Sequence, residues 1–322
     1  MARGYRRLAR DYSSIEIRMG IIRKAIQHPE KILPALIDGE RMHWLPEKQF
    51  LRLAYRASMG KKLDLQNPKT FNEKLQWLKL YDRKPEYTIM VDKYKVRDYI
   101  KDKIGEEYLI PLIGVWDNPE DIDFDSLPNQ FVLKCNHNSG LGMYICKDKS
   151  KLTANDIKKI RKNLAKGLAQ NYYLAGREWP YKDVPRKIIC EKYMEDESTA
   201  GALTDYKFFC FNGEVKCLYV SDCINHKMQF YDNEYNMLDI ERDDHTQFET
   251  LPRKPVNFEQ MKKLAQQLSK GIPHVRVDLY EINKRIYFSE LTFSTCSGFI
   301  PFKDRKWDEL LGSWLKLPEN NA

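Results

Sequence analysis

The sequence predicts an α+β protein in which a helical N-terminal region precedes strands interleaved with single helices. Up to about residue 103 the apolar residues recur at helical spacing, whereas short apolar runs separated by turn residues predominate beyond residue 108. Asn212-Gly213 lies between two of these runs and is the strongest short hairpin signal in the chain. Helices first and then strands with single helices between them is the order typical of an α+β fold.

The composition is that of a globular protein large enough for two or three subdomains. The chain has 322 residues, of which 42% are hydrophobic and 31% charged. No apolar run approaches the roughly 18 residues of a membrane span, and the N-terminus lacks the features of a secretory signal. Seven cysteines without paired spacing indicate reduced thiols and no zinc site. We therefore expect a cytoplasmic protein.

The net charge of +8 favours phosphorylated ligands or an anionic surface. Arginines gather near the N-terminus, at residues 3, 6, 7 and 10. Peripheral contact of this segment with the inner face of a membrane is an open alternative to packing on the protein body. No nucleic-acid-binding module is recognisable, so we expect no nucleic-acid partner.

The first half of the chain is predicted to be mainly helical. Amphipathic helices are expected over residues 14–37, interrupted by prolines, and over residues 45–59. Thr70 and Glu73 form a capping-box pattern that starts the next helix, and residues 90–103 predict another. A strand over residues 108–115 and a loop or short helix over 117–129 then precede a strand that begins at Phe131.

The second half alternates strands and helices. Thr153 and Asp156 predict a capped helix, and Asn257 predicts the start of another that ends before Gly271. The strands are expected at 187–194, at 206–211 and 214–220 across Asn212-Gly213, and at 274–280 and 285–293 across Asn283-Lys284.

The stretch FVLKCNHNSGLGMYICK, residues 131–147, reads as strand, loop and strand. Lys134 ends the first strand, and Gly140 and Gly142 allow the loop backbone to turn through positive φ and approach a ligand. Backbone N–H groups in such a turn can bind phosphate beside the lysine. An ordinary hairpin with a glycine turn is the alternative. The loop does not match the Walker pattern.

The last two predicted strands carry acids that can meet. Strand alternation places Arg276 and Asp278 on one face, and Glu290 and Thr292 on one face of the next strand. In a hairpin, Asp278 and Glu290 converge, and paired carboxylates completed by phosphates suit Mg²⁺. The alternative is a pair of solvent-facing acids.

Two further strand ends carry weaker signals. Glu191-Lys192-Tyr193-Met194 ends an apolar strand whose free edge can hydrogen-bond a purine, with Tyr193 and Met194 against its faces. Asp205 and Lys207 share a face, so Lys207 can reach a phosphate; a local ion pair of little consequence is the alternative.

In this order and spacing these residues resemble the ATP-grasp superfamily, in which two α+β subdomains clasp ATP. The resemblance is closest to the TupA-like ATP-grasp proteins, associated with teichuronopeptide and capsular or exopolysaccharide synthesis. It covers about residues 70–302 and rests on the ordered phrases FNEKLQWLKLYDR, FVLKCNHNSG, DYKFFCFNGEVK and ELTFSTCSGF. It implies a helical region over 1–85, a subdomain with the phosphate loop over 86–190, and a subdomain with the Mg²⁺ and substrate sites over 191–322.

The resemblance also implies a role for each matching residue. Nucleotide phosphates would meet Lys93, Lys134, Lys207 and the loop 136–142, including Asn136, Ser139, Gly140 and Gly142. Adenine would be held by Glu191, Lys192, Tyr193 and Met194. Mg²⁺ would be bound by Asp278, Glu290 and Thr292, although the wider superfamily often has Asn at the last position. Arg276 would stabilise the transferring group.

The implied reaction is ATP-dependent ligation of a carboxylate to an amine, here a hexuronic acid and an amino acid, with the sugar free, nucleotide-linked or lipid-linked. Asp222 and His226 are candidate proton acceptors for the amine, with a surface histidine as the alternative. Thr295, Ser297 and Gly298 are candidate substrate-binding residues. A glycosyltransferase using Asp121-Ile122-Asp123 or Asp123-Phe124-Asp125, and a non-catalytic scaffold, are the rival hypotheses.

Overall fold

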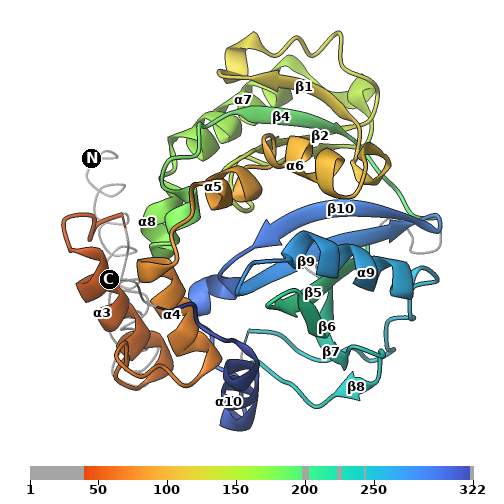
Figure 1. The fold of residues 1–322 in the computed structure, drawn as a ribbon. Helices are drawn as coiled ribbons and strands as arrows, with labels where there is room; N and C mark the ends of the chain where they lie inside the picture. Colours follow the sequence, from red (N-terminus) through yellow and green to blue (C-terminus); the bar gives the residue numbers. More distant parts are fainter. Residues whose placement is uncertain (1–39, 198–202, 223–226, 243, 320–322) are drawn as a thin grey trace, which may run out of the picture. The chain divides into compact units, whose positions relative to one another are not determined.

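The computed structural model describes residues 40–197, 203–222, 227–242 and 244–319 (Figure 1). Contacts divide the chain into two units, residues 1–63 and residues 64–322. The helices expected over 14–37 lie outside the described residues. In the first unit, the expected helix at 45–59 is present as α3 (Glu47–Met59), which ends at Gly60 with a left-handed φ of 68°. The candidate site lies in the second unit, to which the following paragraphs refer.

Three helices open the second unit. The capping box predicted at Thr70 starts α4 (Phe71–Tyr81) as expected. A single helix over residues 90–103 was expected, and this is wrong: α5 (Pro85–Val91) and α6 (Val96–Lys103) are separate. They break at Asp92, whose carboxylate accepts hydrogen bonds from the backbone N–H of Tyr94 (2.8 Å) and from the side chain of Asn136 (2.7 Å). This competing side-chain bonding places Lys93 between the helices.

The first sheet is antiparallel, in the order β1-β4-β2-β3. Its strands are β1 (Leu112–Trp116), β4 (Ile188–Lys192), β2 (Phe131–Cys135) and β3 (Tyr144–Cys146). The strand expected from residue 108 starts later, because Glu106–Tyr108 is a 3₁₀ turn. Helix α7 (Ala154–Ala169), with its predicted capping box, packs Ile160 and Leu164 against Phe131 and Ile188. The short α8 (Tyr172–Gly176) follows.

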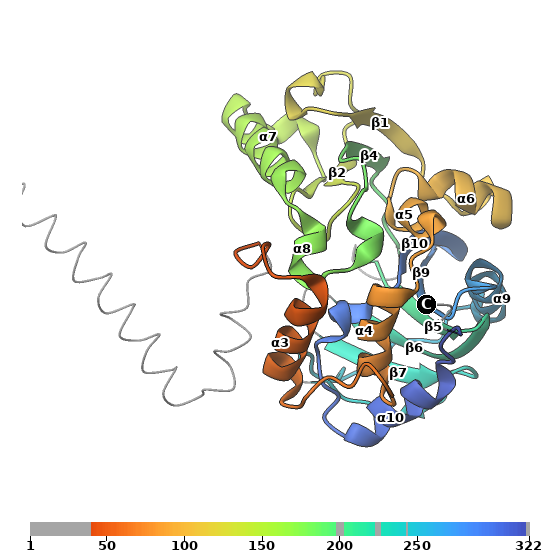
Figure 2. The same cartoon turned by 60° about the vertical axis from the view of Figure 1, so that its left-hand side comes forward.

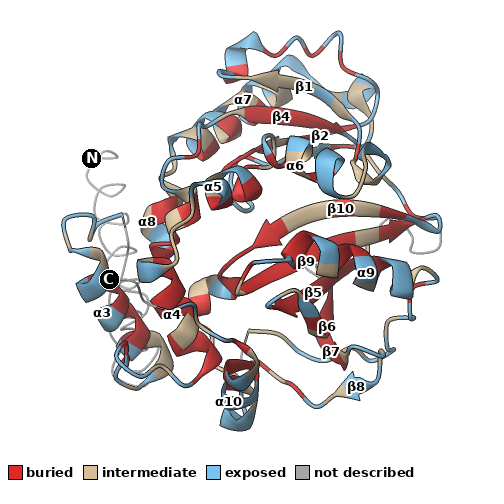
Figure 3. Ribbon diagram, in the orientation of Figure 1, coloured by how far each residue is buried: buried red, intermediate tan, exposed pale blue. Residues whose placement is uncertain are grey.

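The second sheet is antiparallel, in the order β10-β9-β5-β6-β7-β8. Its strands are β5 (Asp205–Phe211), β6 (Glu214–Asp222), β7 (Lys227–Asp232), β8 (Met237–Leu238), β9 (His274–Ile282) and β10 (Arg285–Thr292). Helix α9 (Phe258–Ser269) buries Met261 and Leu264 with Val275 and Val277 of β9 in one core. Figure 3 shows the resulting burial along β5 and β9. Helix α10 (Arg305–Trp314) lies beside α4 (Figure 2), where the Asn72 backbone N–H donates to Asp308.

The predicted hairpins and their turns are present. Asn212 and Gly213 join β5 to β6, and Asn283 and Lys284 join β9 to β10, all four with positive φ. The register pairs Glu290 with Asp278 across β10 and β9, and Lys207 with Asp278 across β5 and β9. Because side chains alternate along a strand, the face opposite the α9 core carries these polar residues together.

None of the described helices combines the length and the apolar character that crossing a membrane requires.

Candidate active site

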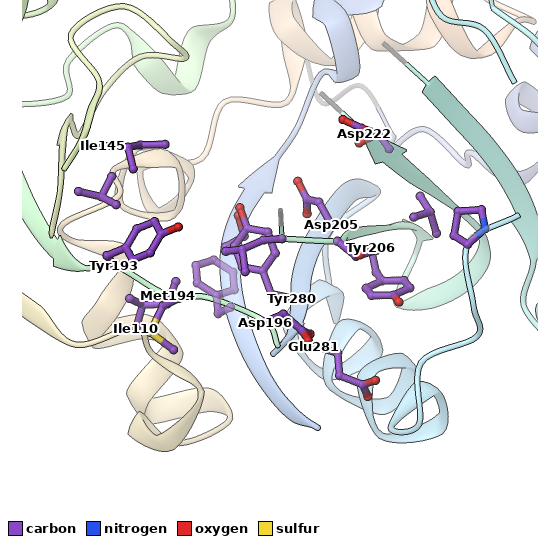
Figure 4. A pocket seen from close by; sticks show the side chains of 18 of the residues that line it. Ile110, Ile145, Tyr193, Met194, Asp196, Asp205, Tyr206, Asp222, Tyr280 and Glu281 are labelled. Carbon is purple, nitrogen blue, oxygen red and sulfur yellow. The ribbon is translucent and has the colours of Figure 1, made fainter. Parts of the chain in front are cut away.

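A cavity of about 700 Å³ is lined by residues of both sheets (Figure 4). The first sheet contributes Val132 and Lys134 of β2, Ile145 of β3, and the end of β4. The second contributes Asp205 and Tyr206, Val220 to Asp222, Tyr280 and Glu281, and Phe288 and Ser289. This volume lies within the range of small-molecule and cofactor sites.

One end of the cavity is apolar and is edged by charge. Figure 4 shows Ile110, Ile145, Tyr193 and Met194 on the same side of the cavity. Glu191 lines the cavity beside them. Its carboxylate forms ion pairs with Lys134, at 2.6 Å from Nζ, and with Arg97, at 3.7 Å from Nη1. Lys134 and all four residues of the predicted purine segment, 191–194, therefore line one cavity. An aromatic and a thioether side chain beside a strand end suit a flat heterocycle.

A cluster of alternating charges lies next to the cavity on the second sheet, and Asp205, which lines the cavity, contacts it through Lys207. The Arg276 guanidinium donates to both oxygens of Asp278, at 2.7 and 2.6 Å, and to Glu290 Oε1 at 3.0 Å. Lys207 Nζ donates to Asp278 Oδ2 at 2.9 Å and also to Asp205. Arg276 further donates to the Tyr219 hydroxyl at 3.2 Å. The predicted convergence of Asp278 and Glu290 is thus present, and Arg276 bridges the two carboxylates.

Lys93 joins this cluster from the helical segment before the first sheet. Its Nζ donates to the backbone carbonyl of Asn138 at 2.8 Å and lies 3.8 Å from Glu290 Oε2. One lysine therefore touches both the loop after β2 and the acid on β10. A cation in this position can neutralise a phosphate that lies between the loop and the sheet.

Burial and neighbouring charge shift the pKa values of the cluster. Burial alone raises the pKa of Glu290, but Lys93, Arg276 and Lys207 outweigh it and hold that pKa at about 2. Burial, reinforced by the nearby Asp278, raises the pKa of Asp205 to about 6 despite Lys207. Burial lowers the pKa of Lys93. Shifts of this kind gather at functional sites, although structural ion-pair networks also produce them.

The oxygen ligands fit Mg²⁺ with phosphate completing its coordination. Among the described residues no group of three or more His, Cys, Asp and Glu could hold a metal by itself. Two carboxylates plus substrate phosphates is nevertheless a common Mg²⁺ arrangement. Glu290 is partly exposed, and Thr292 Oγ1 donates to it at 3.2 Å. Asp278 is fully buried with both oxygens paired, so binding metal there requires Arg276 or Lys207 to release one of them.

The loop after β2 is anchored at its root and open at its tip. Asn136 to Asn138 are buried, whereas Ser139, Gly140 and Leu141 are exposed. The Asn136 amide donates to Asp92 and to the Pro185 carbonyl, and its oxygen accepts from the Lys187 backbone N–H at 2.7 Å. These bonds give Asn136 a role in holding the loop, and its direct contact with a nucleotide remains a prediction. Of the residues predicted to meet phosphate, Ser139 and Gly140 lie at the exposed tip, whereas Gly142 is buried against Cys135.

The candidate substrate residues follow β10 in a 3₁₀ turn, Thr295–Gly298. The Thr295 hydroxyl is buried and has no hydrogen-bond partner among the described residues. The Ser297 hydroxyl donates to the buried Glu178 at 2.6 Å, so it supports the turn, and substrate contact through it remains a prediction. The Gly298 carbonyl accepts from Gln76 at 3.0 Å.

Several polar residues of this region were not predicted from the sequence. They are Gln76, Lys79, Glu178, Asp205 as a cavity residue, and Tyr219. A signal existed for the first two, because the phrase FNEKLQWLKLYDR carries Gln76 and Lys79 three residues apart on one helical face. Nothing in the sequence indicates that this face is buried.

Asp222 lines the cavity, at the end of β6 beside Ser221 (Figure 4). At this end of the second sheet, Asp205 pairs with Ser221 and with Tyr280. Arg276, which pairs with Thr292, lies further along β9, away from this end. His226 lies outside the described residues, so its role as a proton acceptor stays a prediction. The acids of the two D-x-D triplets, Asp121, Asp123 and Asp125, are exposed, and none of them lines the cavity.

The model of the TupA-like ATP-grasp family matches residues 73–316, about three quarters of the chain. The chain belongs to the TupA-like ATP-grasp family. Its α+β fold is accordingly the ATP-grasp fold that the resemblance implied. Among curated proteins, none matches the chain significantly.

Solved ligase structures share a distant likeness with this ATP-grasp chain. The D-alanine–D-alanine ligase of Bacillus anthracis is 19% identical over 64% of this chain and 57% of its own, with a TM-score of 0.39. The corresponding Helicobacter pylori enzyme is 15% identical over 76% and 69%, with a TM-score of 0.41. The ATP-grasp ligase PsnB with its minimal precursor is 11% identical over 65% and 54%, with a TM-score of 0.35. The chain thus spans less than two thirds of the first of these, and the likeness carries no information about substrates.

Proposed function

We propose that this protein is an ATP-dependent ligase that joins a carboxylate to an amine. The observation that carries the proposal is a cavity of nucleotide size whose polar wall adjoins the cluster Lys93, Lys207, Arg276, Asp278 and Glu290. Three cations and two acids side by side can neutralise a triphosphate and hold its metal ion at once. Membership of an ATP-grasp family supports the same assignment.

Each group has a physical task in such a reaction. The apolar end with Tyr193 and Met194 would hold the base, and Lys134 lines the same cavity from the end of β2, just before the phosphate loop. Bound Mg²⁺ would supply charge neutralisation on the phosphates, held by Glu290 and Asp278. Lys93 and Lys207 would orient the phosphates. Arg276, with five donors in a planar fork, suits the oxyanion that forms at the acyl carbon.

The reaction balances as two transfers. A substrate carboxylate oxygen attacks the terminal phosphorus of ATP, so that ADP leaves and an acyl phosphate forms. The amine nitrogen then attacks the acyl carbon, inorganic phosphate leaves, and the nitrogen loses a proton. Asp222 and His226 are the proposed proton acceptors. Thr295 and Gly298 are the proposed contacts of the amine substrate.

We further propose a hexuronic acid as the carboxylate and an amino acid as the amine, in the synthesis of a surface polysaccharide. This choice rests on the association of the TupA-like proteins with such polymers. Because the reaction consumes ATP, we place the protein in the cytoplasm. Contact of the basic N-terminal segment with the membrane would bring a lipid-linked sugar within reach.

The test begins with nucleotide binding and proceeds to turnover. Thermal shift with ATP at several Mg²⁺ concentrations measures binding, and ADP release with hexuronic acids and mixed amino acids measures ligation. Lys134→Ala should reduce turnover on the order of 10²-fold, because a phosphate cation is lost. Lys187→Ala is the matched control, since Lys187 directly precedes β4 and pairs with Asp117, which does not line the cavity. Unchanged turnover in Lys134→Ala, or turnover of a nucleotide sugar without ATP, would refute the proposal.

A further inference from the structure

The turn after β10 has an unusual backbone. Cys296, Ser297 and Gly298 adopt left-handed φ values of 49°, 54° and 63° in succession. For a residue other than glycine, this conformation is unfavourable, and it persists only where surrounding groups fix it. Figure 1 shows the chain leaving β10 toward α4. The groups that fix the turn should therefore come from that helix.

Two side chains of α4 bind the backbone carbonyls of this turn. Gln76 Nε2 donates to the carbonyls of Ser297 and Gly298, both at 3.0 Å. Lys79 Nζ donates to the Ser297 carbonyl at 2.6 Å, to the Gly176 carbonyl at 2.8 Å and to Gln76 Oε1 at 3.0 Å. An ammonium group has three donors, so Lys79 is fully used. Its Nζ also lies 4.4 Å from the centre of the Phe299 ring.

A third contact comes from the segment after α8. The Ser297 hydroxyl donates to Glu178 Oε1 at 2.6 Å, so Ser297 links Lys79 to Glu178. Gly176 allows the close approach, because a Cβ there would lie 2.3 Å from Ser297 Oγ. Burial lowers the pKa of Lys79 to about 7 and raises that of Glu178. Two buried ionisable groups of this kind rarely increase stability over apolar residues.

We propose that Gln76 and Lys79 are positioning residues that hold the Thr295–Gly298 turn in the shape that receives the acceptor substrate. The proposal rests on the ligase function proposed above. The turn begins three residues after Thr292. The Thr292 hydroxyl donates to Glu290, which also accepts from Arg276, so the turn directly follows the charge cluster in the chain. Thr295, with a buried hydroxyl that lacks a partner among the described residues, is the group that the turn holds ready for a polar ligand.

The same helix provides a matched control. Lys74 also donates to two backbone carbonyls, of Gly312 at 2.8 Å and Leu315 at 2.7 Å, at the end of α10. Lys74→Met and Lys79→Met therefore remove the same kind of interaction from one helix at two different targets. Gln76→Leu removes the contacts to the turn without changing charge.

Hydrogen exchange resolved to peptides measures the effect directly. The reporting bonds are Ser297 N–H to the Ser294 carbonyl (2.8 Å) and Phe299 N–H to the Cys296 carbonyl (3.1 Å). Gln76→Leu loses two hydrogen bonds to the turn, and Lys79→Met loses one. Exchange in the 294–300 segment should therefore speed up by roughly tenfold or more in Gln76→Leu and by several-fold in Lys79→Met. Lys74→Met should leave that segment unchanged and speed exchange near residues 312–315. Equal exchange of 294–300 in Lys79→Met and wild type, or the same increase in Lys74→Met, would overturn the proposal.

Kinetics separates this positioning role from general weakening. In Gln76→Leu the KM for the amine should rise several-fold while the Mg²⁺-dependent shift with ATP is retained. A parallel loss of both would show that the turn serves overall folding and would overturn the proposal. If wild type gives no shift with ATP, the ligase function fails, whereas the exchange experiment still decides whether α4 holds the turn.

Discussion

Removing Lys207 should expose the energetics of the buried charge cluster. In Lys207→Met, Asp278 keeps its two hydrogen bonds from Arg276. Asp205 loses the hydrogen bond that Lys207 donates to Oδ2, and its other oxygen, Oδ1, has no partner among the described residues. A buried carboxylate without a partner becomes protonated. Relative to an unfolded pKa near 3.8, forced protonation costs at most about 5 kcal/mol at pH 7.5 and about 2 kcal/mol at pH 5.5.

The sign of the pH dependence follows from the raised pKa of Asp205. A carboxyl that binds its proton more tightly when folded gains stability as the pH falls toward its unfolded pKa. In wild type the pKa of Asp205 is about 6, so its protonation adds only a little stability between pH 7.5 and 5.5. We therefore expect the loss of unfolding free energy in Lys207→Met to shrink by about 2 kcal/mol between pH 7.5 and 5.5. Urea denaturation at the two pH values measures it.

Two variants serve as controls. Lys216 and Glu214 form a pair two residues apart on β6, the strand next to β5, just as Lys207 and Asp205 do on β5. Lys216→Met therefore removes the same kind of pair, but its partner Glu214 is exposed. Its effect on the free energy of unfolding should be much smaller than that of Lys207→Met, because water screens an exposed ion pair. Lys207→Met combined with Asp205→Asn should remove the pH dependence. An equal loss at both pH values, or a double variant that keeps the pH dependence of the single one, would refute the assignment of the effect to Asp205.

Three further predictions concern other parts of the site. Glu290→Gln should be less stable than wild type at pH 7, and this difference should vanish as the pH falls from 4.5 toward 2. A carboxyl with a lowered pKa contributes its stability above the unfolded pKa and loses it as the pH falls through the folded one. The denaturation midpoint of both proteins, measured across this pH range, decides it. Gly142→Ala should cost about 1–3 kcal/mol in urea denaturation, since its Cβ would lie 2.7 Å from Cys135 Sγ, whereas Gly140→Ala, with the same sign of φ and open space, should cost less. His226→Ala should slow amide formation while ATP affinity is retained, and equal loss of both would contradict its role as proton acceptor.

Local signals in the sequence determined the secondary structure wherever neighbouring residues alone set the conformation. The capping boxes at Thr70 and Thr153 and the turns at 212–213 and 283–284 all form, because cap bonds and positive φ depend on adjacent residues. The helix break at Asp92 was missed for the opposite reason. Asp92 is bound by Asn136, 44 positions away, and this partner is visible only in the folded chain.

The candidate site divides along the same line. Strand alternation and the ordered family phrases were enough to name Lys134, Lys207, Asp278 and Glu290, because period two fixes which side chains share a face. Only the tertiary structure joined Lys93 to Glu290 and brought Gln76, Lys79 and Glu178 to the turn after β10. Such contacts cross from one sheet or helix to another. A sequence specifies the faces that each element presents, but the partner that buries a polar face is decided by packing.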